Sequence, residues 1–274
     1  MTGSAPRYVR RFDGVDRTLH GFLMLSFLGL ALTGLPLVFS DQGWAARLVR
    51  VFGGFETAGL IHRVGATILI GVFTVHLLRL GRRLIVGKEW GIVWGPTSMV
   101  PRPKDWDDMV GHIRWFVGRG PRPQFDRYPY WEKFDYWAVF WGMGVIGASG
   151  LLLWFPMFFS HYIPGWVFNV ALLIHGEEAL LAVGFIFTMH FFNGHLRPEK
   201  FPMDRVIFTG VVPEEELRHE RPAEYARLQA DGQLDPLRTE APASWLVHLG
   251  TTIGTLAVVI GLSLVALIIY ALFT

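Results

Sequence analysis

The sequence contains no cysteine, and this absence limits the redox chemistry that the chain can carry by itself. Disulfide bonds, iron–sulfur clusters ligated by this chain and haem attached through a C-x-x-C-H motif are all excluded. Charge is also sparse, since charged residues make up 18% of the sequence and the formal net charge is +2. This net charge by itself does not indicate a nucleic-acid partner, and we expect none. The amino-terminal residues include arginines but no apolar run with a small-residue cleavage site, so we expect no removable signal peptide.

Apolar segments, in contrast, are long and numerous. Hydrophobic residues account for 51% of the 274 positions, and the mean hydropathy is +0.35. A segment needs about twenty apolar residues to cross a bilayer, and spans of this kind are helical because open sheet edges cannot lie in lipid. The sequence predicts an all-α membrane protein that contacts lipid. The expected spans lie at about 19–39, 60–80, 135–159, 168–193 and 246–273.

Basic residues are distributed unequally between these spans. Four arginines precede the first span, eight lysines and arginines lie from Lys88 to Lys133, and seven lie from Arg197 to Arg238. The positive-inside rule places these three segments in the cytoplasm. We therefore expect a multi-pass protein of the cytoplasmic (inner) membrane, with a cytoplasmic amino terminus and a periplasmic carboxyl terminus.

Two of the expected helices each carry a pair of histidines. His175 and His190 are 15 residues apart, which in an α-helix is about 60° around the axis and about 22 Å along it. His62 and His76 are 14 residues apart, about 40° around and about 21 Å along. With the expected orientation, His62 and His175 lie near the outer face, and His76 and His190 near the inner face. Ionisable side chains inside a span are costly and are usually retained for a partner or a task.

Paired imidazoles at matching depths on two helices can hold haem between them, so we predict bis-histidine b-type haem. His62 and His175 are the candidates for an outer haem. His20 also lies in the inner layer, so His20, His76 and His190 are all candidates for an inner haem. A packing or proton-relay role explains any single histidine, but packing alone does not explain two matched pairs.

His195 is a further histidine after the fourth span. In an α-helix it would lie about 140° around the axis from His190, which argues against both residues serving one site. A third haem that uses His195 with His20 or His76 is left open.

The expected architecture is a four-helix transmembrane haem-binding bundle with one additional C-terminal transmembrane helix. We expect a helix in the cytoplasmic loop with Asp105 or Asp107 as its N-cap, and an acidic helix that begins near Pro213 and whose charge serves solvation. The expected domains are a cytoplasmic segment 1–18, a haem domain 19–200 that includes the cytoplasmic loop 87–133, an amphipathic cytoplasmic linker 201–245 and a fifth helix 246–273.

The order of these features resembles the cytochrome b (gamma) subunit of membrane-bound formate dehydrogenases and related subunits of nickel–iron hydrogenases and thiosulfate reductases. The segment RFDGVDRTLHGFLMLSFLGLALTGLPLVF is similar to the family's first helix, with an arginine shortly before a histidine and a Thr-Gly pair near its outer end. The family's second, third and fourth helices are similar to LIHRVGATILIGVF, YWEKFDYWAVFWGMGVIGASGLLLWFP and IHGEEALLAVGFIFTMH in this chain. The amphipathic tail after the family's fourth helix is similar to PMDRVIFTGVVPEEELRHERPAEY. The resemblance covers about residues 7–230.

The resemblance implies two b haems that carry electrons from a periplasmic partner to a quinone near the cytoplasmic face. It implies His62 and His175 as ligands of the outer haem, and His20 and His190 as ligands of the inner one. Spacing alone favours His76 with His190, so the inner pairing stays open. Features without a counterpart in the family pattern are His76, His195, the pair Glu177–Glu178 and the fifth span.

Further polar residues near the histidines are candidates for quinone and proton chemistry. Glu177 and Glu178 lie inside the fourth span, where a carboxyl group that holds a proton suits exchange with a quinol. A bond to Arg63 is the structural alternative. In the inner layer, the histidine that the haem does not use, with Asn193 and His112 as further candidates, could face a quinone.

Together these features predict a quinone-reactive electron-transfer subunit of a respiratory oxidoreductase complex. It would move electrons between menaquinone or ubiquinone and a periplasmic or membrane-associated redox subunit through two or more b haems. That partner would be an iron–sulfur protein or a multihaem cytochrome c, because this chain has no metal–sulfur or flavin motif. A proton or ion transporter with intramembrane histidine and glutamate relays is the alternative.

Overall fold

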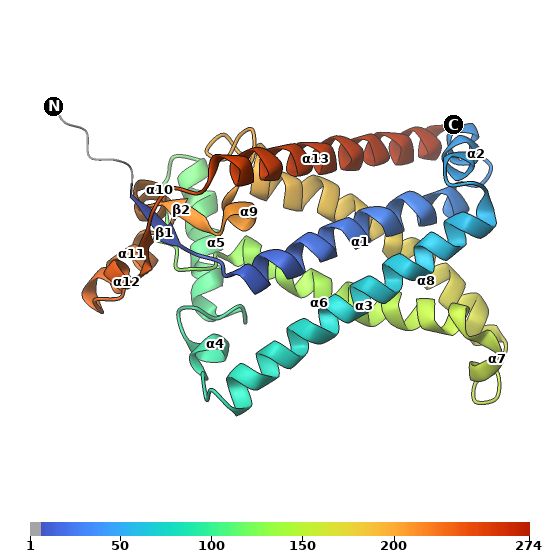
Figure 1. The fold of residues 1–274 in the computed structure, drawn as a ribbon, viewed down its shortest axis with the longest axis horizontal. Helices are drawn as coiled ribbons and strands as arrows, with labels where there is room; N and C mark the ends of the chain where they lie inside the picture. Colours follow the sequence, from blue (N-terminus) through green and yellow to red (C-terminus); the bar gives the residue numbers. More distant parts are fainter. Residues whose placement is uncertain (1–6) are drawn as a thin grey trace. The chain divides into compact units, whose positions relative to one another are not determined.

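The computed structural model describes residues 7–274, so part of the expected 1–18 segment and part of the stretch considered for a signal peptide lie outside the described residues. Within 7–274, five helices are long and apolar enough to cross a membrane (Figure 1). The expected all-α membrane fold is confirmed. These helices are α1 Gly14–Val38, α3 Phe55–Ile85, α6 Tyr130–Trp154, α8 Trp166–Phe185 with its continuation to Leu196, and α13 Ser244–Phe273.

The helices differ from the expected spans mainly at their ends. Most helices are longer than the expected apolar spans, because helical backbone hydrogen bonds continue into flanking polar sequence, as in the segment from Arg79 to Ile85 at the end of α3. The third membrane span, α6, ends earlier than expected, at Trp154, and the short helix α7 Pro156–Phe159 follows. Pro156 accounts for this break, since a residue before proline is disfavoured in the helical conformation and Phe155 has φ −119° and ψ 53°.

The chain divides into two compact units. The helical unit comprises 19–77, 138–204 and 252–274, and the strand-containing unit comprises the described residues 7–18 together with 78–137 and 205–251. The helical unit contains all of the histidines predicted to bind haem. It also contains α2 Gly43–Val51, a short helix between α1 and α3.

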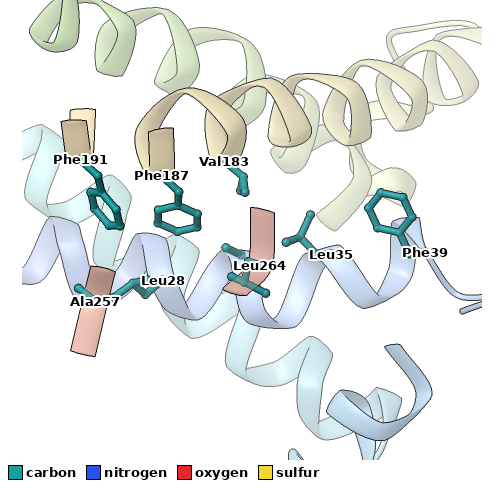
Figure 2. Close-up of a cluster of buried hydrophobic side chains, with 9 residues drawn as sticks. Leu28, Leu35, Phe39, Val183, Phe187, Phe191, Ala257 and Leu264 are labelled. Carbon is teal, nitrogen blue, oxygen red and sulfur yellow. The ribbon is translucent and has the colours of Figure 1, made fainter. Parts of the chain in front are cut away.

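A buried apolar cluster joins α1, the α8 segment and α13 within the helical unit (Figure 2). Figure 2 shows Val183, Phe187 and Phe191 directed toward the side of α1 that carries Leu28 and Leu35. Gly261 of α13 lies against these rings, since a Cβ there would be 2.6 Å from Cδ1 of Phe187. The fifth helix therefore packs through backbone contact with the bundle. The buried members are Leu28, Ala31, Leu35, Phe39, Val183, Phe187, Phe191, Ala257 and Leu264.

The fourth span does not remain α-helical. After α8 come two π-helical turns, η1 Ile186–His190 and η2 Phe192–Leu196. A π-turn takes up one extra residue in about the rotation of an α-turn. The rotation around the helix axis from His175 to His190 is then about that of 14 α-helical residues, although 15 residues separate them. It therefore matches the rotation from His62 to His76.

The same geometry overturns the expected separation of His190 and His195. That expectation of about 140° assumed an α-helix. Because η2 is π-helical, the rotation from His190 to His195 falls to about 40°. The two side chains therefore lie on similar sides of the segment.

The strand-containing unit holds a small antiparallel sheet that the sequence did not predict. Strand β1 Tyr8–Arg10 lies between β2 Val211–Pro213 and β3 Arg238–Thr239, with Val9 opposite Val212 and Arg238. The short helices α9 Val206–Thr209, α10 Glu214–Glu220, α11 Pro222–Ala230 and α12 Leu234–Leu237 complete this part. Val9, Val206, Val212, Leu217, Leu228 and Leu234 form its buried core.

The starts of two helices in this unit can be compared with those expected from the sequence. The expected N-cap of Asp105 or Asp107 is wrong, because α5 Pro103–Phe116 begins earlier, with Arg102 as its N-cap. The carboxylate of Asp105 instead accepts a hydrogen bond from the Arg102 backbone N–H at 2.6 Å, from the third helical position. The acidic helix α10 begins directly after Pro213, as expected. The remaining short helix is α4 Gly91–Trp94.

The charge of α10 and α11 does not serve solvation alone, which corrects the sequence-based expectation. Glu224 is 2% exposed and accepts hydrogen bonds from Arg11 at 2.7 Å and Arg127 at 3.1 Å. Burial by itself would raise the pKa of Glu224, but the guanidinium groups of Arg11 and Arg127 outweigh it and hold this pKa below its ordinary value. The neighbouring Arg221, also buried, donates to Glu132 at 2.5 Å.

Candidate functional site

His62 of α3 and His175 of α8 face each other in the helical unit. Their ring centroids are 6.3 Å apart and their planes meet at 67°. A metal–imidazole bond is about 2 Å long and the ring centre lies roughly 1.2 Å behind the nitrogen, so two imidazoles on opposite sides of one iron have centres about 6 Å apart. The separation of His62 and His175 therefore fits bis-histidine haem ligation.

A hydroxyl group on a neighbouring helix contacts each of these rings. Thr33 Oγ1 of α1 is 3.0 Å from Nδ1 of His62. Ser149 Oγ of α6 is 3.2 Å from Nδ1 of His175, and the Ile146 carbonyl is 3.1 Å from the same nitrogen. In both rings Nδ1 is engaged by the protein, which leaves Nε2 as the nitrogen suited to a metal.

A glycine follows each hydroxyl residue and makes room for the ring. A Cβ at Gly34 would lie 3.1 Å from Cε1 of His62, and a Cβ at Gly150 would lie 3.0 Å from Cε1 of His175. The histidines were predicted from their spacing, but the roles of Thr33 and Ser149 were not predicted. The signal available was the repeated hydroxyl–glycine pair, Thr-Gly in α1 and Ser-Gly in α6.

Three further imidazoles, those of His20, His190 and His195, gather at a second place in the helical unit. His20 interacts electrostatically with both His190 and His195. Phe191 contacts the other two rings, with centroids 6.3 Å from His190 and 5.8 Å from His195. Among the described residues, Nδ1 of His195 is buried and has no hydrogen-bond partner. The π-turns thus bring to one cluster two histidines that an α-helix would have separated.

His76 has a different setting. Its ring lies edge to face with Phe140 of α6, with centroids 6.2 Å apart. The neighbours that affect His20 electrostatically are His190 and His195. His20 thus interacts with His190 and His195, and the ring of His76 contacts α6.

The other polar residues considered for quinone and proton chemistry are Glu177, Glu178 and Asn193, and each has a different environment. Glu178 accepts a hydrogen bond from the indole N–H of Trp141 on α6 at 2.6 Å, and Glu177 is exposed. The backbone carbonyl of Asn193 accepts a hydrogen bond from Arg197 at 2.9 Å. The contact of Glu178 is therefore with an α6 tryptophan, where the sequence suggested Arg63.

His112 belongs to the strand-containing unit and packs in an aromatic cluster. It is 7% exposed, stacks on Phe116 at 4.6 Å between centroids and lies 3.1 Å from the hydroxyl of Tyr130 through Nδ1. These contacts are typical of a buried structural histidine.

Among residues 7–274, no group of three or more histidine, cysteine, aspartate or glutamate side chains is placed to hold a metal ion. Haem iron takes its equatorial ligands from the macrocycle and needs only two from the protein. Fold and site together therefore define a multi-pass α-helical membrane protein with facing imidazoles suited to haem.

Comparison with known proteins extends this definition. No family model matches the chain. The chain is 20% identical over 181 residues to the cytochrome b556(Fdn) subunit of the nitrate-inducible formate dehydrogenase of Escherichia coli K12, covering 66% of this chain and 75% of that protein. It is 21% identical over 174 residues to the cytochrome b556(fdo) subunit of formate dehydrogenase from the same strain, covering 63% of this chain and 72% of that protein. The resemblance to formate dehydrogenase cytochrome b subunits is confirmed.

Proposed function

We propose that this chain is a membrane cytochrome b that transfers electrons between a quinone pool and a partner redox subunit through at least two b haems. The facing pair of His62 and His175, with ring centroids 6.3 Å apart, is the observation that carries the proposal. The similarity to two cytochrome b556 subunits of formate dehydrogenases supports it. Bound haem supplies the one-electron carrier that no side chain of this chain can provide.

The residues of the chain have distinct proposed roles. His62 and His175 hold the outer haem through Nε2, because Nδ1 of each ring is engaged by a neighbouring helix. His20 and His190 hold the inner haem. The electrostatic interaction of His20 with His190 supports this pairing, and the family resemblance agrees with it.

His195 is the proposed partner of the quinone. Its Nδ1 is buried and no other side chain of the described residues bonds to it, although the backbone of Gly194 interacts with the ring, so Nδ1 can interact with a carbonyl or hydroxyl oxygen of the ligand. Asp204 interacts electrostatically with His195 and forms an ion pair with Lys200 at 3.0 Å. This pair offers a polar connection from His195, as proton exchange with a quinone requires.

Orientation and partner follow from the charge distribution and the relatives. The basic segments support an amino terminus in the cytoplasm, with His62 and His175 toward the periplasm. The relatives are subunits of formate dehydrogenases, so the proposed partner is a redox subunit at the periplasmic side.

Haem analysis of the purified protein tests the proposal. We expect a dithionite-reduced b-type absorption band and at least two haems per chain by pyridine haemochrome. His62→Ala and His175→Ala should each remove one haem, whereas His76→Ala should retain both. Fewer than two haems in the wild type, or full haem content in both outer variants, would contradict it. A transporter with a histidine relay would show no such band.

A further inference from the structure

We propose that Thr33 and Ser149 are positioning residues that fix the protonated nitrogen and the orientation of the two outer imidazoles, and thereby lower the reduction potential of the outer haem. The part that concerns haem rests on the proposed function. The part that concerns the imidazoles rests on the hydrogen bonds alone.

The direction of each hydrogen bond follows from the hydroxyl groups. Thr33 Oγ1 donates its single hydrogen to the Gly29 carbonyl at 2.7 Å. Its 3.0 Å contact with His62 must then have Nδ1–H as the donor. Both imidazole nitrogens are in this way assigned, with the hydrogen on Nδ1 and the lone pair on Nε2.

The second pair repeats this arrangement on other helices. Ser149 Oγ donates to the Val145 carbonyl at 2.7 Å, so His175 Nδ1–H donates to Ser149 Oγ at 3.2 Å and to the Ile146 carbonyl at 3.1 Å. The Leu30 carbonyl, one turn before Thr33, makes the corresponding backbone hydrogen bond with His62. Two unrelated helices thus offer the same two acceptors, a hydroxyl and the carbonyl three residues before it.

Burial makes these hydroxyl groups hard to replace by water. Thr33 is 2% exposed and Ser149 is 5% exposed. A hydrogen bond in such a setting is stronger than one in water, and a lost partner is not restored by solvent. The glycines beside them, Gly34 and Gly150, keep each ring within reach of its hydroxyl.

The chemical consequence is a more basic ligand. A hydrogen-bond acceptor at Nδ1–H increases electron donation from the other nitrogen to a bound metal. Greater donation stabilises the ferric state relative to the ferrous state, which lowers the reduction potential. The two acceptors also hold the ring planes at 67° to each other, an arrangement that gives low-spin ferric haem a strongly anisotropic EPR signal.

Matched variants separate the hydroxyl group from the shape of the side chain. Thr33→Val keeps the branched shape and removes the hydroxyl, whereas Thr33→Ser keeps the hydroxyl. We expect Thr33→Val to raise the midpoint potential of the outer haem, to alter its EPR signal and to weaken its binding by about 10-fold or more. The inner haem should not change, and Thr33→Ser should resemble the wild type. Ser149→Ala, with Ser149→Thr as its control, should act in the same direction.

The outcomes distinguish this inference from the proposed function. Loss of the outer haem from Thr33→Val but not from Thr33→Ser supports the inference. An unchanged outer potential and EPR signal in Thr33→Val with both haems bound overturns it. If the wild type bound no haem, the proposed function would fail. ¹⁵N NMR of protein that contains ¹⁵N-labelled histidine would still test the part of the inference that concerns the imidazoles. The expected result is Nδ1–H on His62 in the wild type, with a ¹⁵N resonance that shifts in Thr33→Val, because only the Leu30 carbonyl then remains as an acceptor. Nε2–H on His62 in the wild type, or an unchanged Nδ1 resonance in Thr33→Val, rejects it.

Discussion

At the scale of single residues, the arrangement of His62 and His175 depends on the hydroxyl groups of Thr33 and Ser149 and on the glycines beside them. The histidines were predictable, because ionisable groups are rare inside apolar helices and their spacing repeats on two of them. The roles of Thr33 and Ser149 were not, because serine and threonine in helices commonly bond to their own backbone one turn earlier. The sequence does not reveal that the same oxygen also accepts a bond from a histidine on another helix.

Replacement of Gly150 by alanine should disturb the outer haem alone. The new Cβ would lie 3.0 Å from Cε1 of His175, so the ring must shift and its contacts with Ser149 and the Ile146 carbonyl must change. We expect about one haem per chain to be lost or its band to shift, as measured by pyridine haemochrome and reduced-minus-oxidised spectra. Gly147→Ala is the control, since no atom lies within 4 Å of a Cβ there. Equal haem content and identical spectra in both variants would contradict this role of Gly150.

At the scale of helices and strands, hydropathy predicted the five spans but not how they end or bend. The π-turns have no simple sequence signature, because they reflect how the end of the fourth span packs. The strands of the small sheet contain three residues or fewer, and β1 pairs with segments about 200 residues away, so no local period could reveal them.

The contact of α13 with η1 should be sensitive to a single methyl group. Gly261→Ala would place Cβ 2.6 Å from Phe187 Cδ1, and such overpacking costs about 1–3 kcal/mol. We expect a lower thermal unfolding temperature in detergent. The double variant Gly261→Ala with Phe187→Leu should recover part of the loss, because the smaller side chain gives space. No recovery in the double variant would assign the loss to Phe191, whose Cε2 would lie 2.7 Å from the same Cβ.

The buried ion pairs of the strand-containing unit should make its stability decrease at low pH. The pKa of Glu224 is lowered in the folded chain, and unfolding returns it to about 4.3. The stabilisation is therefore complete above this ordinary value and is lost as the pH falls through the lowered, folded-state pKa, since the unfolded chain then binds the additional proton. We expect stability, followed by tryptophan fluorescence during heating, to fall with pH in that window.

Glu224→Gln should remove part of this acid dependence. It should also destabilise the unit by about 3–5 kcal/mol at neutral pH, because Arg11 loses its buried charge partner. Glu89→Gln serves as the control: its ion pair with Arg83 is about half exposed on both sides, and such pairs contribute about 1 kcal/mol or less. The same acid dependence in Glu224→Gln and the wild type would assign the effect to other groups.

At the scale of the whole molecule, composition and residue order were enough to predict the class of protein. The all-α membrane fold followed from apolar length, and the family resemblance followed from the order of motifs over most of the chain. The division into two compact units could not be predicted, because the strand-containing unit is assembled from three separate stretches of sequence.

The absence of cysteine makes the proposed orientation directly measurable. Single cysteines can be introduced at Ser160, expected outside, and at Asp231, expected inside; both residues are exposed. A membrane-impermeant maleimide should label Ser160→Cys in intact spheroplasts and should label Asp231→Cys only after permeabilisation. The unmodified chain gives the background. The reverse labelling pattern would invert the proposed topology.

The π-turn at η1 also bears on how the length of this chain can change during evolution. An α-helix that gains or loses one residue rotates everything beyond that point by about 100° and breaks its contacts. A π-turn has already absorbed such an insertion, so loss of one residue from Ile186–His190 would return the turn to α geometry with little rotation of the residues that follow. Related chains can therefore differ by one residue between their two histidines and still present both imidazoles to the same neighbours.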